Sequence, residues 1–307
     1  FNTALGYQTG KSVTTGYKNT LVGGLAGDAK TTGNNDVAIG YGALSTDVAG
    51  QNSVAVGYNA LFSQNFTTAT NAYNVAVGRS AGEAISTGIQ NTLVGASAGD
   101  ALTDADQNVA VGYLALSADT LGSKSTALGQ GTLKVQNFTT ATDPYNTAVG
   151  YQAGTAVTTG TQNTILGGLA GDALTDADFN VAVGTSALSA DTLGSRAVAI
   201  GRKALFTQNF TTATDNYNVA VGFSAGELIT TGIKNTLVGG LSGDALTDAD
   251  YNVALGYGAL TEDTLGSRSV AVGTFSLVTQ NFTTATNAYN VACLLYTSDA
   301  ADEEDSV

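Results

Sequence analysis

The chain repeats a short unit at nearly constant spacing, and this periodicity restricts the possible folds more than any other feature. A unit of the form Asn-[Thr/Val]-Ala-[Val/Leu]-Gly begins at positions 2, 19, 36, 53, 74, 91, 108, 125, 146, 163, 180, 197, 218, 235, 252 and 269. The spacings run 17, 17, 17 and 21 residues and sum to 72, which gives four blocks covering 2–73, 74–145, 146–217 and 218–289. Repeats of this length predict a solenoid in which each unit forms one coil and contacts its neighbours.

Each unit, numbered here from its first residue, has the composition of a short strand at positions 2 to 4. Position 2 is always Val or Thr, position 4 is always Val, Ile or Leu, and position 3 is Ala in twelve of sixteen units. Side chains at positions 2 and 4 must share one face of such a strand, and position 3 must point to the other. We therefore predict an all-β fold, a parallel β-solenoid of sixteen rungs stacked ~4.8 Å apart.

Glycine at position 5, present in all sixteen units, predicts a corner with positive φ or a close approach of another chain segment. Position 1 is Asn in eleven units. This Asn is expected to form a stacked amide ladder or to cap the incoming turn, which is a structural role.

The larger apolar side chains, at positions 2 and 4, are expected to face the interior. Position 9 reads Gly, Gly, Leu, Leu in every block, and position 12 is aliphatic in seven of the eight units with Gly at position 9, Lys30 being the exception. The aliphatic side chain at position 12 would fill the space that Gly leaves at position 9, as a close-packed interior requires. The small position 3 would then face outward and allow close approach of a second copy of the chain. The candidate interface residues are Ala76, Ala110, Ala148, Ala182, Ala220 and Ala254.

The repeat breaks after residue 292, three residues into a seventeenth unit. The stretch CLLYTS at 293–298 resembles the translation of a sequencing-library adapter, so we expect 293–307 to be a non-native tail and 1–292 to be a single repeat array from a longer chain. A native acidic tail is the alternative.

Charge and composition argue against several classes of function. Five of the 25 acidic residues lie in the tail, which leaves 20 acids against 11 Lys and Arg and a net charge of −9. No basic stripe is available for nucleic acid or for an anionic membrane surface. The chain has no His, and its acids recur with the repeat, so we expect no enzyme activity, because catalysis needs one unique constellation of groups. No cofactor is predicted.

Every fourth unit is four residues longer and contains the sequence motif QNFTTATxxY. We expect these loops to project along one edge, roughly 19 Å apart, and to bind a repetitive receptor through avidity. The alternative is that their rings fill the core beneath a wider coil. The candidate receptor residues are Phe66, Tyr73, Phe138, Tyr145, Phe210, Tyr217, Phe282 and Tyr289.

The sequence GDALTDAD occurs three times and places three Asp residues in one turn region. Clustered oxygen ligands suit calcium, although acids in turns are usually solvated or bonded to local backbone, so these are weak metal candidates. They are Asp100, Asp104, Asp106, Asp172, Asp176, Asp178, Asp244, Asp248 and Asp250.

The units NSVAVGYNAL at 52–61, NTAVGYQAG at 146–154 and NVAVGTSAL at 180–188 resemble the head repeats of YadA-like trimeric autotransporter adhesins. They look equally like repeat arrays of phage tail fibres. The coils of 17 and 21 residues are longer than the adhesin pattern. The resemblance implies a left-handed β-roll, a homotrimer, and an extracellular location on a bacterial surface or a virion. It implies attachment to a host glycan or protein, with no membrane contact by this segment. A spacer shaft without a ligand is the alternative.

An ice-binding solenoid is a further alternative, because such proteins need a flat and regular Thr array. Thr occupies position 2 in seven of sixteen units, and these side chains are expected to face inward, which argues against this alternative. They are Thr3, Thr20, Thr92, Thr126, Thr147, Thr164 and Thr236.

Overall fold

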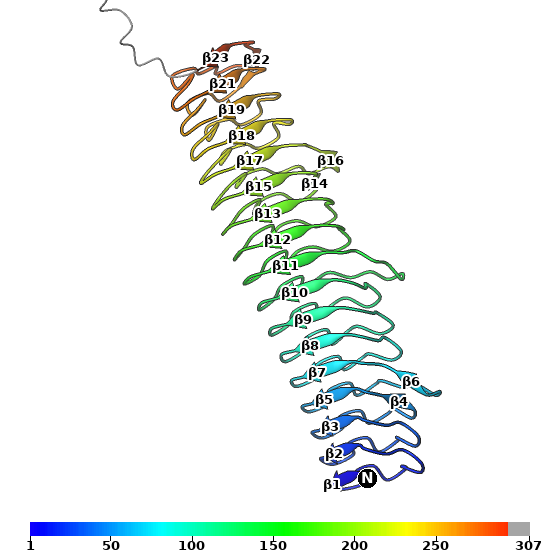
Figure 1. The fold of residues 1–307 in the computed structure, drawn as a ribbon. Coiled ribbons are helices and arrows are strands. Elements are labelled where there is room, and N and C mark those ends of the chain that lie inside the picture. Colours follow the sequence, from blue (N-terminus) through cyan, green and yellow to red (C-terminus); the bar gives the residue numbers. More distant parts are fainter. Residues whose placement is uncertain (294–307) are drawn as a thin grey trace, which may run out of the picture.

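The computed structural model describes residues 1–293, which form one rod of stacked coils (Figure 1). The proposed non-native tail lies outside the described residues, apart from Cys293 at the end of the last strand. Among residues 1–293 there is no helix with the length and hydrophobicity that a membrane span requires.

One parallel sheet of seventeen short strands runs the length of the rod. Its strands are β1 (Thr3–Leu5), β2 (Thr20–Val22), β3 (Val37–Ile39), β5 (Val54–Val56), β7 (Val75–Val77), β8 (Thr92–Val94), β9 (Val109–Val111), β10 (Thr126–Leu128), β11 (Thr147–Val149), β12 (Thr164–Leu166), β13 (Val181–Val183), β15 (Val198–Ile200), β17 (Val219–Val221), β18 (Thr236–Val238), β19 (Val253–Leu255), β21 (Val270–Val272) and β23 (Val291–Cys293). Three two-residue pairs join the third coil of a block to its longer fourth coil: β4 (Gly50–Gln51) with β6 (Thr70–Asn71), β14 (Gly194–Ser195) with β16 (Thr214–Asp215), and β20 (Gly266–Ser267) with β22 (Thr286–Asn287).

Each strand of the long sheet pairs in parallel with the strand of the next coil, and equivalent positions lie over one another. Ala182 pairs with Ala199, for example, and Val183 with Ile200. The predicted parallel β-solenoid is therefore confirmed, with the truncated seventeenth unit adding β23 to the sheet beside β21.

The corner glycine at position 5 is required for two reasons. The sixteen residues have φ between +122° and +146°, a region that side chains strongly disfavour. In addition, a Cβ on Gly167 would lie 2.6 Å from both the carbonyl carbon and the oxygen of Gly184 in the next coil. Adjacent corners therefore touch through their backbones, and both reasons predicted for this glycine hold.

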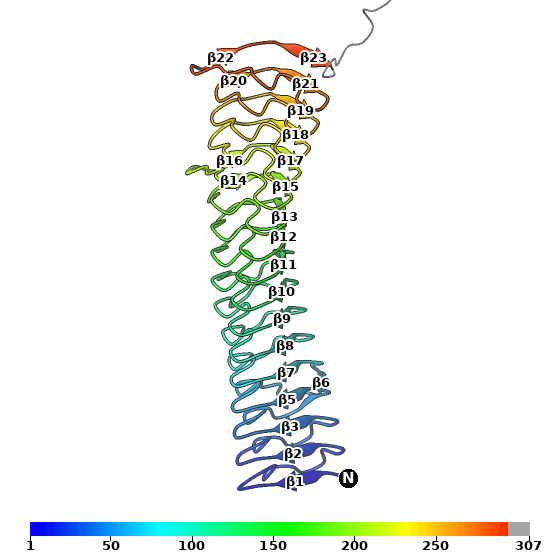
Figure 2. The same ribbon diagram turned by 90° about the vertical axis from the view of Figure 1, so that its left-hand side faces the viewer.

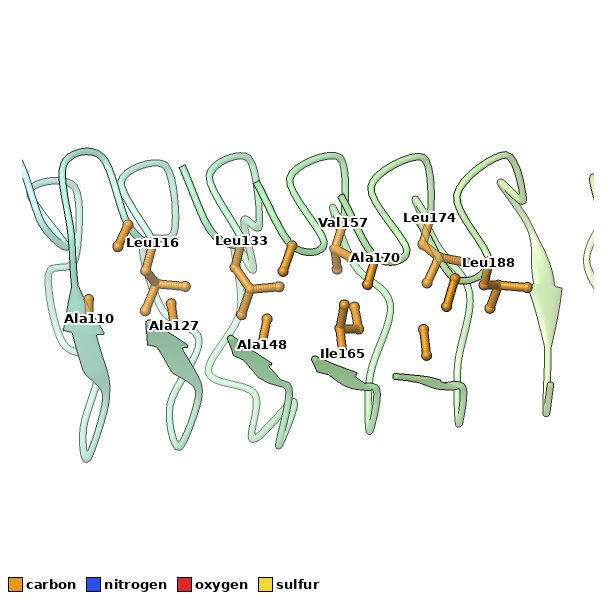
Figure 3. Packing of buried hydrophobic residues seen from close by; sticks show 14 of the residues in the cluster. Ala110, Leu116, Ala127, Leu133, Ala148, Val157, Ile165, Ala170, Leu174 and Leu188 are labelled. Carbon is orange, nitrogen blue, oxygen red and sulfur yellow. The ribbon is translucent and has the colours of Figure 1, made fainter. Parts of the chain in front are cut away.

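The prediction for the two strand faces was wrong. Position 3 faces the interior, where residues such as Ala110, Ala127 and Ala148 are fully buried, and positions 2 and 4 face outward. Figure 3 shows the alanines rising from the strands towards Leu116 and Leu133 of the opposite wall. A coil of 17 residues encloses so narrow a space that Ala on one wall and Leu on the other fill it, and Val at positions 2 and 4 would overfill it.

Larger side chains do fill the space left by Gly at position 9, as predicted. Residues at position 3 contribute to this filling as well as those at position 12. The second coil of each block has Leu or Ile at position 3, and these side chains are buried. A Cβ on Gly82 would lie 2.7 Å from Leu93, and a Cβ on Gly99 would lie 2.8 Å from the same side chain. Leu93 therefore fills the space that the glycines of two successive coils leave open.

The Asn residues at position 1 form the predicted ladder. The Asn91 backbone N–H donates to Asn74 Oδ1 at 2.9 Å, and Asn108 N donates to Asn91 Oδ1 in the same way. Each side-chain amide also donates to a backbone carbonyl of its own coil, such as Asn91 Nδ2 to Ala105 O at 2.7 Å. The ladder thus satisfies a buried backbone N–H at the entry to the strands of the second, third and fourth coils of each block.

A second buried polar row explains why the array repeats every 72 residues. Position 12 is Asp in the third coil and Gln in the fourth, and the two bond across the coils: Gln136 Nε2 donates to Asp119 Oδ2 at 2.6 Å. Asp119 Oδ1 also accepts from Gly122 N and Phe138 N. Gln136 Oε1 in turn accepts from Asn146, the first residue of the next block. This row links every long coil to the coils on both sides.

The buried Asp residues of this row make stability depend on pH. Burial raises the pKa of Asp119 and of Asp191, although hydrogen bonds from Gln136 and Gln208 oppose the change. The folded chain then keeps these protons to a higher pH than the unfolded chain does, so unfolding releases protons once pH exceeds the ordinary Asp value. The contribution of these groups to the free energy of unfolding is therefore largest at low pH, and it is lost as pH rises through their raised pKa values.

We therefore expect the unfolding midpoint, followed by circular dichroism between pH 4 and 7, to fall as pH rises. A variant with Asp119→Asn and Asp191→Asn is expected to show a smaller slope over this range, whatever its absolute stability. An equal slope in the two proteins would contradict the assignment.

Candidate interaction surfaces

The strand residues at positions 2 and 4 form a continuous surface, here called the outer strand face, in which position 4 is always aliphatic and position 2 is Val in nine units and Thr in seven. Position 4 is the more exposed column, with Leu128 at 44% and Leu166 at 46% exposure. No helix or second sheet among residues 1–293 covers it. The face therefore runs the length of the rod as an exposed stripe two side chains wide.

Exposed aromatic rings flank the outer strand face just beyond the corner glycines. At position 6, Tyr113 and Tyr151 are about half exposed, and Tyr41 stacks on Tyr58 of the next coil with ring centroids 5.7 Å apart. Aromatic residues are enriched at interfaces, because they bury a large apolar area and keep a polar group at the edge. These rings widen the apolar surface on one side.

The alanines predicted as a trimer interface lie on the wrong side of the strand for that role. Ala76, Ala110, Ala148, Ala182, Ala220 and Ala254 all have no exposed surface. They pack inside the coil and cannot contact a second chain. The adjoining outer strand face is the surface that the prediction missed, and the buried Leu or Ile at position 3 in the second coil of each block was the signal for it.

The longer coils project from the rod at 72-residue intervals, and their tips, such as Thr67, Thr68 and Ala69, are exposed. In Figure 1, β6 and β16 extend to the same side of the rod. In Figure 2 they lie on opposite sides of the strands, so the row of loops winds around the axis instead of following one straight edge.

The loop aromatics separate into two groups. Phe66, Phe138 and Phe210 are buried at 6–7% exposure, and Phe282 is partly buried. These rings fill the core beneath the wider coil, which was the alternative interpretation, so they are not contact residues. Tyr73, Tyr145, Tyr217 and Tyr289 are about half exposed or more. They stay candidates for receptor contact.

Three of the four exposed loop Tyr residues belong to a small polar cluster that includes a cation; in the first block Asn52 occupies the position of the cation. In the second block, Lys124 pairs with Asp143 and lies 5.4 Å from the centroid of the Tyr145 ring. The third block repeats this cluster as Arg196, Asp215 and Tyr217, and the fourth as Arg268, Asn287 and Tyr289. Sequence reasoning missed the cations, which lie one coil before the Tyr, although their 72-residue spacing was visible.

The division of the loop aromatics gives a direct test. Phe138→Ala is expected to lower the free energy of unfolding by about 3 kcal/mol, because it empties a buried site. Tyr145→Ala is expected to cost less than about 1 kcal/mol, because an exposed ion pair and cation–π contact contribute little. Denaturant unfolding of both variants measures the difference, and similar losses would show that the two rings are not separated as described.

The acidic turns are not assembled into a metal site. Among residues 1–293, no group of three or more His, Cys, Asp and Glu side chains is placed to hold a metal ion. The candidate acids bond to adjacent coils instead: Asp104 accepts from Thr87 Oγ1 at 2.6 Å, and Asp106 accepts from Ile89 N at 2.8 Å. Asp176, Asp178, Asp248 and Asp250 repeat these two bonds, and Asp172 and Asp244 accept from Ser189 and Thr261.

Asp100, the remaining candidate, has one buried oxygen without a hydrogen bond. Burial raises the pKa of Asp100 and of Asp244, which disfavours the charged form that a metal requires. The turn acids therefore tie coils together, in agreement with the ordinary role of acids in turns.

No protein-family model matches the chain, and no curated protein or solved structure is significantly similar to it.

Proposed function

We propose that this chain is a structural and adhesive segment of an extracellular fibre, in which three copies associate through the outer strand face. The resemblance of its units to YadA-like adhesin heads and phage tail-fibre repeats supports a bacterial surface or a virion as the setting. The observation that carries the proposal is the uncovered aliphatic face along the whole described rod.

The size of this face favours association. Two side chains per coil, each roughly a third exposed, amount to on the order of 1,000 Å², whereas the largest apolar patch of a typical monomer is ~300–600 Å². The estimate is close to the ~800 Å² that each partner contributes to a standard interface. Burial of the face between copies would remove this surface from water and add stability that the narrow core of each coil lacks.

The loop clusters supply the adhesive part of the proposal. Tyr73, Tyr145, Tyr217 and Tyr289 recur every four coils, which corresponds to ~19 Å along the axis. A host-surface glycan or protein bound weakly at several of these loops would be held through avidity. In a pure spacer, simultaneous Tyr→Ala changes at the four positions would leave retention on host cells unchanged.

Charged substitutions on the outer strand face test the association. A variant with Val109→Lys, Val111→Lys, Val181→Lys and Val183→Lys places four charges in the proposed interface, and burial of unpaired charge is costly. We expect it to sediment as a single chain while the unmodified protein sediments as a larger species.

A control with Thr211→Lys and Thr212→Lys adds charge at an exposed loop tip, away from the face. It is expected to keep the assembled mass. If the outer-face variant also keeps that mass, copies do not associate through this surface.

Ice binding is a second candidate, because one observation removes one of the two objections raised from the sequence, the inward orientation of the Thr residues; the array is still interrupted, with Thr in seven of sixteen units. Position 2 faces outward, so its Thr side chains lie on the outer strand face, and Thr126, Thr147 and Thr164 are adjacent in successive coils. A purified sample that produced thermal hysteresis would favour this function over the fibre. Its absence would leave the fibre as the only proposal.

A further inference from the structure

The interior of the first block contains a cluster of charged side chains that the proposed function does not use. Lys30, Asp36 and Asp47 have no exposed surface. The Lys30 Nζ atom lies 2.8 Å from Asp36 Oδ2 and 2.9 Å from Asp47 Oδ2. Charged groups in a dry interior are costly even when they are paired, so an apolar core would have been the simpler solution.

The other three blocks show that simpler solution at the same positions. Lys30 is replaced by Leu102, Leu174 and Leu246, and Asp36 is replaced by Asn108, Asn180 and Asn252. The position of Asp47 stays Asp in all four blocks, as Asp119, Asp191 and Asp263. Only the first block thus carries the Lys and the additional Asp, and it carries both together.

The contacts hold the amine against one carboxyl group. Lys30 Nζ donates to Asp47 Oδ2 and, at 3.0 Å, to Gly50 O. Asp36 Oδ1 accepts from Ser53 N at 2.8 Å, which fixes the carboxyl plane. The other oxygen, Asp36 Oδ2, has no hydrogen-bond partner, although the amine lies against it. The amine nitrogen therefore contacts an oxygen of the Asp36 carboxyl group, and its hydrogen bonds are directed to Asp47 and Gly50 instead.

The environment favours the neutral form of this carboxyl group. Burial raises the pKa of Asp36 to about 6, against the opposing charge of Lys30. A neutral carboxyl group is the form that an amine can attack, because its hydroxyl can leave as water.

We propose that Lys30 and Asp36 become joined by an intramolecular isopeptide bond, with Asp47 as the catalytic proton carrier. Transfer of one proton from the Lys30 ammonium to the Asp36 carboxylate gives a neutral amine and a neutral acid. The nitrogen lone pair attacks Asp36 Cγ, the Nζ–Cγ bond forms, and Asp47 accepts a proton from the nitrogen. The Cγ–OH bond then breaks as Asp47 returns this proton to the hydroxyl, and one water molecule leaves.

The product is an amide and a restored Asp47 carboxylate, so the net charge of the cluster is unchanged. Two opposite charges disappear from the interior, which removes their desolvation cost. The fixed approach of the two groups supplies the proximity that favours condensation in a dry site. The bond closes a loop over the turn 30–36 and fixes the second coil to the start of the third.

Intact mass spectrometry of the folded full chain tests the proposal. The expected mass is lower than that of the sequence by one water molecule. Trypsin is expected not to cut after Lys30, and tandem spectra are expected to lack fragments from breaks between residues 30 and 36. An unmodified mass in the folded protein would overturn the proposal. Loss of water with normal fragmentation between these residues would also overturn it, since that pattern indicates a succinimide.

Three variants serve as controls. Lys30→Arg keeps the charge and is expected to have the unmodified mass. The double variant Lys30→Leu with Asp36→Asn reproduces the pattern of the other blocks, so it is expected to fold and to have the unmodified mass. Asp47→Asn is expected to slow the loss of water after refolding at least tenfold, and an unchanged rate would remove Asp47 from the mechanism.

Discussion

Gly167→Ala is expected to destabilise the rod by about 4 kcal/mol or more, because the change combines two separate penalties. The residue has φ of +140°, and the added Cβ would lie 2.6 Å from the backbone of Gly184. The carbonyl of Gly184 cannot move away freely, because Gly184 N donates to Leu166 O at 2.7 Å in the preceding coil. A shift at one corner would therefore disturb the pairing of β12 with β13.

The neighbouring residue provides a matched control. A Cβ on Gly168 would have no atom within 4 Å, and other coils have Tyr or Thr at this position, such as Tyr151 and Thr185. Gly168→Ala is expected to change stability by less than about 1 kcal/mol. Thermal unfolding and amide exchange in β11 to β13 measure both variants. Equal stability of the two would mean that the corner does not have the geometry described.

The second large effect concerns Lys30. The single variant Lys30→Leu leaves Asp36 buried without a cation, whereas the double variant with Asp36→Asn has the neutral pattern of the other three blocks. We expect the single variant to be about 3–5 kcal/mol less stable than the double variant, the usual cost of an unpaired buried charge. Neither protein contains the Lys30 amine, so the comparison does not depend on an isopeptide bond.

Denaturant unfolding at pH 8 measures this difference, because Asp36 is charged in the unfolded chain at that pH, and the folded single variant must either bury this charge or bind a proton. The difference is expected to shrink below pH 5, where Asp36 binds a proton. A single variant that is as stable as the double variant at pH 8 would show that the charge of Asp36 is solvated or otherwise compensated.

The repeat period alone was sufficient to predict the fold class and the place of every strand in the long sheet. Val or Thr at position 2, an aliphatic residue at position 4 and Gly at position 5 mark a three-residue strand that ends at a corner. All of these strands formed, because stacking gives each the same neighbours. The ladder at Asn91 and Asn108 was also predictable, because a buried side-chain oxygen in a periodic stack can accept from the backbone N–H of the equivalent residue in the next coil.

The assignment of the strand faces failed, because hydrophobicity was weighed without volume. Val181 and Val183 are larger than Ala182, yet the narrow coil accepts only the smaller side chain. The correct orientation was readable from Leu93, which occupies the alanine position in a coil with Gly at position 9. The error carried over to the interface candidates and to the orientation of the Thr residues.

The buried polar row and the Lys30 cluster could not be placed from the sequence, since most of their contacts join different coils. Asp47 and Gln64, for example, both occupy position 12 of their coils. Their contact depends on equivalent positions lying over one another, which only the register of the coils establishes. The loop Phe residues had two interpretations for the same reason, because Phe138 follows an exposed Asn and precedes exposed Thr residues.

The association of copies through the outer strand face is the central claim, and the mass of the full chain in solution tests it most directly. Size-exclusion chromatography with multi-angle light scattering is expected to give three times the mass of one chain, with an elongated shape. A folded single chain at micromolar concentration would contradict the claim, because the exposed aliphatic stripe would then be stable in water without a partner.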